Sequence, residues 1–546
     1  MAASKHASSH TDEQSGSKPD DIKVATDAVD EAQLPSREEW VPSKHEKAII
    51  YTLAAINVIV ALDATIVITP LNKIINDLGG DATQAFWIGT SYLLVNAVTM
   101  PIICSISNIF GRLICLTFAL LAFSAGTICC CTAQNVPTML VGRSIQGTDI
   151  VPLRYRPKWY GVTLGAWALG LSLGPVLGGA IAQSTTWRWI FYLMFPFCAF
   201  GLVAVPYLLT LRPKESSARV KLSRVDWVGC FIFMGSATSF LIAVPWGGLQ
   251  HDWDSAETLA PLIVGAAGLI ATLFYEACVA KEPFLRHSLY HDASSIVTYI
   301  PGCMQGLVMY GLLYYGPFYT LSIKGFNSLH AGAAMLPCMV AVTVTGIVSG
   351  RLVTRFNNYR WAICIGWFVA SVGSALFLIW PAANDSTAVW VITYVIAGVG
   401  EATVLNAQNF ASQAMCKPGD EASAAAMYVF ARQFGMALGV GIGGTTFQNV
   451  MTLKLRWESL PTDIAKIAEG YISVLDTLPD DLFKHKVLDA YKFGFIGANS
   501  FYLGLSFTAS VLSVVFVKNI DLTRKLESGH HLDGKRMTRH CDTPKE

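Results

Sequence analysis

The chain has 546 residues, of which 53% are hydrophobic and only 14% are charged, whereas about a quarter of residues are charged in ordinary soluble enzymes. Together with a mean hydropathy of +0.45, this composition excludes an ordinary soluble enzyme and indicates a polytopic membrane protein. The net charge of +1 says little by itself, because in membrane proteins the distribution of Lys and Arg among the loops matters more. We expect the lipid bilayer, and no nucleic acid, as a partner.

Residues 1–43 are rich in Ser, Lys, Asp and Glu and contain few large apolar side chains. Such a segment cannot bury enough surface to fold, so we predict a disordered tail. It also lacks the charged and apolar regions of a removable signal peptide, so we expect the first membrane span to direct insertion.

Apolar runs predict about fourteen membrane-spanning helices. They cover residues 48–69, 86–106, 113–133, 136–152, 160–182, 190–210, 226–245, 258–279, 296–320, 331–350, 361–381, 388–408, 422–446 and 493–517. Every second short loop is basic and the intervening loops nearly lack Lys and Arg. Both termini are therefore predicted to be cytoplasmic. The long connection over 448–492 and the glycosylation sequon at Asn384 then fall outside.

A carboxylate lies deep in the first predicted span, at Asp63. Burying a charge in mid-membrane costs about 2.5 to 3.5 kcal/mol on insertion scales, so an intramembrane Asp is a candidate functional residue. The alternative is a protonated Asp that makes a hydrogen bond between packed helices.

The fourth predicted span is short. Only some 17 residues separate the external turn from the basic cluster at Arg154, and they include Arg143, Gln146 and Asp149. We nevertheless predict a crossing here, because without it every later basic loop would be external.

Small residues recur on the fifth predicted span. Gly170, Gly174 and Gly178 share one helical face that a partner helix can approach closely, and Pro175 interrupts the helix. The run Gly170-x-x-x-Gly174-Pro175-x-x-Gly178-Gly179 resembles the antiporter motif of major facilitator drug exporters. The continuation Thr186-Trp187-Arg188-Trp189-Ile190-Phe191 is similar to the way that family enters its sixth span.

Most of the chain, from about residue 45 to 520, resembles the fourteen-span drug:proton antiporters of the major facilitator superfamily, and its loops are most similar to those of fungal toxin and multidrug exporters. The resemblance implies an all-α fold of two six-helix bundles with two extra helices. The implied parts are a cytoplasmic tail over 1–43, a first bundle over 44–212, two linker spans over 213–285, a second bundle over 286–520 and a cytoplasmic tail over 521–546. It also implies export of a small organic substrate in exchange for protons, by rocking of the bundles.

The resemblance assigns proton coupling to Asp63 and to Arg143, which lies in Gly142-Arg143-Ser144-Ile145-Gln146-Gly147. Each residue lies about seven residues from the outer end of its helix, or roughly 10 Å at 1.5 Å per residue. Because they share a depth, we expect them to be able to pair. The alternative for Arg143 is an interface anchor forced inward by the short helix.

Gly111 and Arg112 match the family's cytoplasmic loop motif between the second and third spans, but Cys104 and Asn108 stand where Gly and Asp are usual. The charge relay attributed to this loop is therefore expected to be weakened.

Further polar and aromatic side chains within apolar runs are candidates for lining a substrate cavity, and core packing is the alternative for each. Glu401 and Arg432 are additionally expected to neutralise a buried charge, with each other as one choice of partner, whereas Glu276 is expected to snorkel at a helix end. The candidate cavity residues are Gln146, Gln305, Tyr310, Tyr314, Glu401, Asn406 and Arg432.

The sequence contains no nucleotide-binding, hydrolase or metalloprotease motif and no metal-ligand spacing. We therefore expect neither an enzyme nor an ATP-driven pump, with no cofactor or metal and with transport driven by the proton gradient. Two alternatives stay open: an ion-coupled importer of the same fold, and a non-transporting or damaged membrane protein, given the short fourth span. We expect the plasma membrane, with the vacuolar membrane as the alternative.

Overall fold

The structure is a computed structural model that describes residues 44–80, 82–148, 157–209, 217–247, 251–280, 283–285, 287–290, 293–380, 387–417 and 420–518. Residues 45–518 belong to one compact unit. The tail predicted over 1–43, the sequon at Asn384 and the tail predicted over 521–546 lie outside the described residues.

The described residues form helices that are joined by turns. They also contain one isolated β-bridge, between Gly247 and His251. The helices are α1 (Lys44–Ile66), α2 (Leu71–Asp77), α3 (Ala82–Phe110), α4 (Arg112–Thr132), α5 (Val136–Gln146), α6 (Pro157–Ser184), α7 (Trp189–Tyr192), α8 (Phe195–Leu208), α9 (Ala218–Ser223), α10 (Trp227–Trp246), α11 (Ala256–Cys278), the 3₁₀ helix η1 (His287–Tyr290), α12 (Ala293–Ser322), α13 (Ser328–Ala334), α14 (Leu336–Phe356), α15 (Arg360–Phe377), α16 (Thr387–Met415), α17 (Glu421–Trp457), α18 (Asp463–Lys466), α19 (Ala468–Thr477) and α20 (Leu482–Phe516).

Thirteen helical segments in the described part of the chain are long and apolar enough to cross a membrane. Large apolar side chains also stand on the outer surface, among them Phe118, Val203 and Tyr207, which are 71%, 73% and 81% exposed. An apolar surface of this kind is unfavourable in water and suits contact with lipid. The all-helical class expected from the sequence is confirmed, and the chain is a multi-pass integral membrane protein.

Helix α5 stands where the fourth span was predicted, but it has only 11 residues, or about 16 Å of helix. It runs antiparallel to α4, starting near the end of α4 that is opposite to Arg112. Residues 149–156, which connect it to α6, lie outside the described residues.

The direction of helix α6 shows that the chain has nevertheless crossed back to the side of the bundle from which α1 starts. Gly170, Gly174 and Gly178 contact α1 at Val58, Thr65 and Ile66 in turn, so α6 runs parallel to α1. The parity argument for a crossing at α5 is therefore supported, although α5 itself is too short to be a full span.

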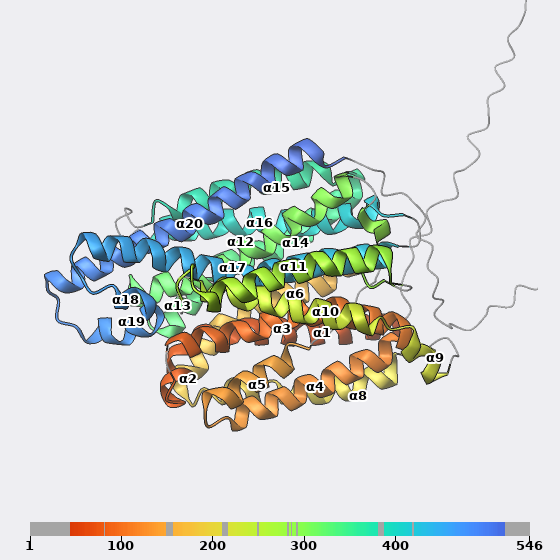
Figure 1. Cartoon of the computed structure of the whole chain (residues 1–546), viewed down its shortest axis with the longest axis horizontal. Coiled ribbons are helices and arrows are strands. Elements are labelled where there is room, and N and C mark those ends of the chain that lie inside the picture. The colour runs from red at the N-terminus through yellow and green to blue at the C-terminus, as the bar shows by residue number, and fades with distance from the viewer. Residues whose placement is uncertain are drawn as a thin grey trace, which may run out of the picture. The chain divides into compact units, whose positions relative to one another are not determined.

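Two groups of helices follow the chain order (Figure 1). The early helices α1, α3, α4, α5 and α8 lie together, and the late helices α12, α14, α15, α16 and α20 lie together on the other side of α10 and α11. Helix α10 packs into the groove between α3 and α17, where Phe233 contacts Phe430 at a ring distance of 5.7 Å. Helix α11 packs on α10 at Gly265 and Gly268 and is otherwise largely exposed.

We define the basic end of this bundle by Arg112, Arg351 and Arg360. We define the loop end by the short helices α2, α13, α18 and α19, which lie together in Figure 1. The connection predicted over 448–492 is shorter than expected, since α17 continues to Trp457 and α20 begins at Leu482. It folds into α18 and α19, whose Ile464, Ala468 and Ile472 are buried in the main core. Apolar side chains inside the loop thus allow it to pack against the core. The polar residues at the two ends of the loop did not indicate this packing.

Candidate functional site

A buried ion pair joins the two residues to which the sequence assigned proton coupling. Arg143 donates from Nη1 to Asp63 Oδ2 at 2.7 Å, and both side chains are fully buried. The expected pairing is present, while the role of the pair in coupling stays a prediction.

Gln146 completes this charge cluster. Its Nε2 donates to Asp63 Oδ1 at 3.2 Å and to Thr127 Oγ1 at 3.0 Å, and its Oε1 accepts from Arg143 at 3.0 Å. Arg143 also lies 5.0 Å from the centre of the Tyr92 ring. Both carboxylate oxygens of Asp63 therefore have donors, which compensates for removing its charge from water.

The local sequence explains why these groups meet. Asn135 caps α5 by accepting a hydrogen bond from the Thr138 amide at 3.0 Å. Gly126 and Gly142 let the backbones of α4 and α5 approach closely, since a Cβ on Gly126 would lie 2.7 Å from the Gly142 carbonyl oxygen. Arg143 and Gln146 are three residues apart and therefore share a helix face. That face points at α1.

The glycines predicted as an antiporter motif have two different neighbours. A Cβ on Gly170, Gly174 or Gly178 would overlap α1, within the first bundle. Gly179 instead contacts the Ser328 backbone, and the Pro175 carbonyl contacts Gly332 on α13. One face of the motif thus joins α6 to α1, and its loop end joins the two halves of the protein.

Glu401 and Arg432 do not pair with each other, so that choice of partner was wrong. Glu401 accepts from Gln305 Nε2 on α12 at 3.1 Å, and one of its oxygens has no partner. Arg432 instead stacks on Trp167 of α6, with its Cζ 4.6 Å from the ring. Glu401 lies on α16 and Arg432 lies on α17. The rotation of these two helices turns the two side chains toward different neighbours.

Two other candidate cavity residues are held by the core. Asn406 donates to the Gly346 carbonyl at 2.6 Å and so ties α16 to α14. Tyr310 is only 3% exposed and packs within the main core. For Asn406 the structure favours the packing interpretation.

Glu276 was expected to snorkel, and it does not. It is only 3% exposed and accepts from the Leu285 amide at 3.3 Å. The backbone at Leu285, beyond the end of α11, reaches Glu276, which the span pattern did not indicate.

Gly111 adopts a φ of +102° between α3 and α4, a conformation that side chains with a Cβ rarely adopt. The matching glycine of the loop motif is therefore required by the turn itself.

Tyr314 lies at a contact between both halves and the loop. Its hydroxyl donates to Glu469 Oε2 on α19 at 3.0 Å, and its ring lies 6.5 Å from Phe86 on α3. With Gly179 and Pro175, this contact closes the loop end between the halves.

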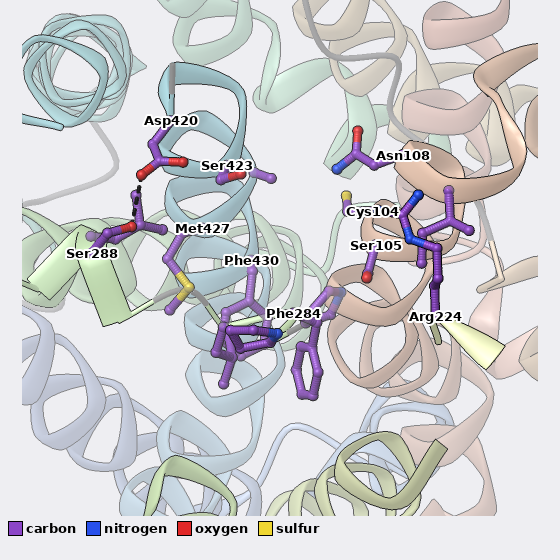
Figure 2. Close-up of a pocket in the computed structure, with 16 residues that line it drawn as sticks. Cys104, Ser105, Asn108, Arg224, Phe284, Ser288, Asp420, Ser423, Met427 and Phe430 are labelled. Atoms are coloured by element: carbon purple, nitrogen blue, oxygen red, sulfur yellow. Dashed lines mark hydrogen bonds between the residues drawn. The ribbon is translucent and has the colours of Figure 1, made fainter. Parts of the chain in front are cut away.

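A cavity of about 510 Å³ lies at the basic end between α3 and α17. Figure 2 shows Cys104, Ser105 and Asn108 on one side and Asp420, Ser423 and Met427 on the other, with Phe284 between them. The Ser288 hydroxyl donates to Asp420 at 2.7 Å. The two departures from the loop motif, Cys104 and Asn108, thus face this cavity, whereas none of the residues predicted to line a cavity does.

Comparison with known proteins settles the family. Residues 53–440 match the sequence model of the Major Facilitator Superfamily. The chain belongs to the major facilitator superfamily. It is a transporter of this type, with membrane lipid around it and a small molecule as its substrate.

Similar proteins include fungal transporters. The MFS transporter L2 of Phoma sp. is 36% identical over 486 residues, which cover 86% of this chain and 81% of that protein. The efflux pump FUS6 of Gibberella moniliformis is 30% identical and covers 78% and 77%. The MFS efflux transporter aclA of Aspergillus oryzae is 30% identical and covers 92% and 95%. These relatives confirm the fungal efflux-pump type of the resemblance.

The fold is also similar to that of a bacterial homologue of the human lysosomal transporter Spinster, in an inward-facing and occupied conformation. The TM-score is 0.57 at 15% identity, and the match covers 88% of this chain and 98% of that one.

Several residues of this transporter's candidate site were missed at the level of sequence. Thr127, Tyr92 and Trp167 contact the buried charges, and Glu469 holds the loop against Tyr314. Trp167 precedes the first glycine of the antiporter motif by three residues, which places it one turn away. The other three carry no local signal, because they are recognised only by the neighbours that folding brings to them.

Glu469 is expected to make docking of α19 sensitive to pH. Burial raises the pKa of its carboxyl from 4.5 to about 7, partly opposed by the hydrogen bond from Tyr314. An undocked Glu469 ionises near its ordinary pKa. Docking should therefore weaken as pH rises from about 4.5 to 7, by about 3 kcal/mol, and change little outside that window.

Hydrogen exchange of α19, corrected for the intrinsic effect of pH, checks this expectation, and Glu469→Gln should remove the dependence. An unchanged pH dependence in Glu469→Gln would contradict it. Among the described side chains, the other titratable groups near Glu469 are phenols with an ordinary pKa of about 10, namely Tyr314, Tyr315 and Tyr491. Charged groups on the neighbouring short helices are exposed or bonded elsewhere, namely Lys73, Asp77, Asp463 and Lys466.

Proposed function

We propose that this chain exports apolar organic compounds in exchange for protons, by alternating access between two helix bundles. The observation that carries the proposal is the fully buried pair of Asp63 and Arg143, whose Nη1 and Oδ2 atoms are 2.7 Å apart. Ionisable residues retained inside a membrane bundle commonly mark proton pathways.

The pair offers a simple mechanism. A proton that reaches Asp63 neutralises the carboxylate and leaves Arg143 as an uncompensated buried charge. Losing one partner of a buried ion pair costs about 3 to 5 kcal/mol, which is enough to shift an equilibrium between conformations that differ by a few kcal/mol. Protonation would thus favour a conformation in which Arg143 finds water or another partner.

The arrangement of the halves supports alternating access. Helix α6 contacts α13 at the loop end, and a cavity separates α3 from α17 at the basic end. By the distribution of Lys and Arg, the basic end and both termini face the cytoplasm. We accordingly propose a state that receives substrate from the cytoplasm, in the plasma membrane.

Transport in vesicles tests the proposal. Purified protein is reconstituted around entrapped pyranine, and a pH gradient is imposed in either direction with rhodamine 6G or naphthalene-2-sulfonate as the probe. An antiporter moves a probe into the acidic compartment while protons leave it, and vesicles without protein set the background. Movement of probe and protons in the same direction would instead identify a symporter, as an importer of this fold would be.

A non-transporting protein is the second candidate, favoured by the 11 residues of α5. It predicts no protein-dependent flux of either probe in either gradient. Sequencing the transcript across residues 140–160 would show whether the short helix is encoded.

A further inference from the structure

Arg432 is a buried cation with no counter-ion among the residues that the structure describes. Its side chain is only 7% exposed, and its Nε and Nη1 atoms have no hydrogen-bond partner. Among the described residues, no carboxylate oxygen lies within ion-pair distance of it, since the ion pairs there involve Arg143 and the Lys and His residues near the loop end. A buried guanidinium in this condition is unfavourable unless something completes its environment.

Arg143, which is also buried, shows how a guanidinium in this protein is compensated. Arg143 has Asp63 at 2.7 Å and Gln146 at 3.0 Å, so its charge is compensated inside one bundle. Arg432 has the face of Trp167 instead. Stacking uses the flat face of a guanidinium and leaves its edge for a planar anion that accepts two hydrogen bonds.

Glu401 does not fill this role, although it is also buried. Its carboxylate is engaged by Gln305 on α12 at 3.1 Å. Gly306 of α12 contacts the Arg432 carbonyl, so Gln305 lies beside this part of α17. Arg432 thus has unpartnered donors, and Gln305 on the adjacent helix α12 has an unpartnered acceptor.

The stack also joins the two halves, because Trp167 belongs to α6 and Arg432 to α17. A substrate of an alternating-access transporter binds where the halves meet. We propose that Arg432, stacked on Trp167, receives the carboxylate of the transported compound, so that the preferred substrates are organic acids. This inference rests on the proposed function and names its substrate class.

Equilibrium binding tests it without any proton gradient. The full chain in lipid nanodiscs at pH 7 is titrated with 2-naphthoate and with 2-naphthamide, which has the same shape without the charge. Binding is measured as thermal stabilisation of the protein by each ligand, and empty discs give the background signal. We expect the acid to bind roughly tenfold more tightly than the amide. Arg432→Gln should bind both alike, and Arg432→Lys should retain part of the preference because it keeps the charge without the planar fork. Gln433→Ala, on the next residue of α17, is the matched control and should behave like the unmodified protein.

Equal or absent stabilisation by acid and amide in the unmodified protein would overturn the proposal, and so would a preference for the acid that persists in Arg432→Gln. Because binding is measured at equilibrium, a failure of proton coupling leaves this result unaffected. Conversely, export of rhodamine 6G by Arg432→Gln under a pH gradient would uphold the proposed function independently of the anion site.

Discussion

Asp63→Asn should reduce proton-driven export to the background of vesicles without protein. Asn keeps the shape of the side chain and removes the group that can exchange a proton. It also leaves the guanidinium of Arg143 buried without a counter-charge, which costs about 3 to 5 kcal/mol in buried pairs. We therefore expect less folded protein as well, measured by size-exclusion chromatography of a fluorescently tagged chain and by the flux of probe per folded molecule.

The double variant Asp63→Asn with Arg143→Gln separates coupling from folding. It removes both charges of the pair, whose Nη1 and Oδ2 atoms lie 2.7 Å apart, so no buried charge is left uncompensated and the yield should recover. Export should remain absent, because no proton acceptor remains in the cluster. Normal proton-driven efflux per folded molecule in either variant would refute the role of Asp63.

Substitutions of single glycines in α6 should separate folding of the first bundle from closure between the halves. Gly174→Ala would drive a methyl group into Thr65 of α1. Overpacking of this kind costs about 1 to 3 kcal/mol, so the apparent Tm should fall. Gly179→Ala would press on the Ser328 backbone in the other half, so the loop end should open while the first bundle stays intact. Double electron–electron resonance between spin labels on α6 and α13 measures that opening.

Gly165→Ala is the matched control in the same helix. A Cβ there would meet only Ile347 at 3.9 Å, an ordinary contact. The change from Gly to Ala should therefore be neutral or stabilising by up to about 1 kcal/mol. Equal Tm values for Gly165→Ala and Gly174→Ala would show that the close approach of α1 and α6 is unimportant.

The sequence was informative about the depth of the buried ion pair. The rise of an α-helix is nearly constant at about 1.5 Å per residue, so counting from the helix ends placed Asp63 and Arg143 at one level. The parity of the basic loops likewise required a crossing at α5, even though its 11 residues fail the length criterion for a span. Both inferences use properties of one helix or one loop at a time.

The same counting could not pair Glu401 with Arg432. Both lie inside apolar runs, but which neighbour each one faces depends on how α16 and α17 are rotated and on which helices they pack against. Those choices arise from the whole interface, and they turned Glu401 to Gln305 and Arg432 to Trp167.

The membrane class, the order of the long helices apart from the short α5 and the shared depth of Asp63 and Arg143 were thus determined by the sequence, because hydropathy and helical rise are local. The partner of each charge, the packing of α19 over Tyr314 and the cavity between α3 and α17 were decided by the tertiary structure. Side chains that are distant in the chain meet only when close packing selects one rotation for every helix.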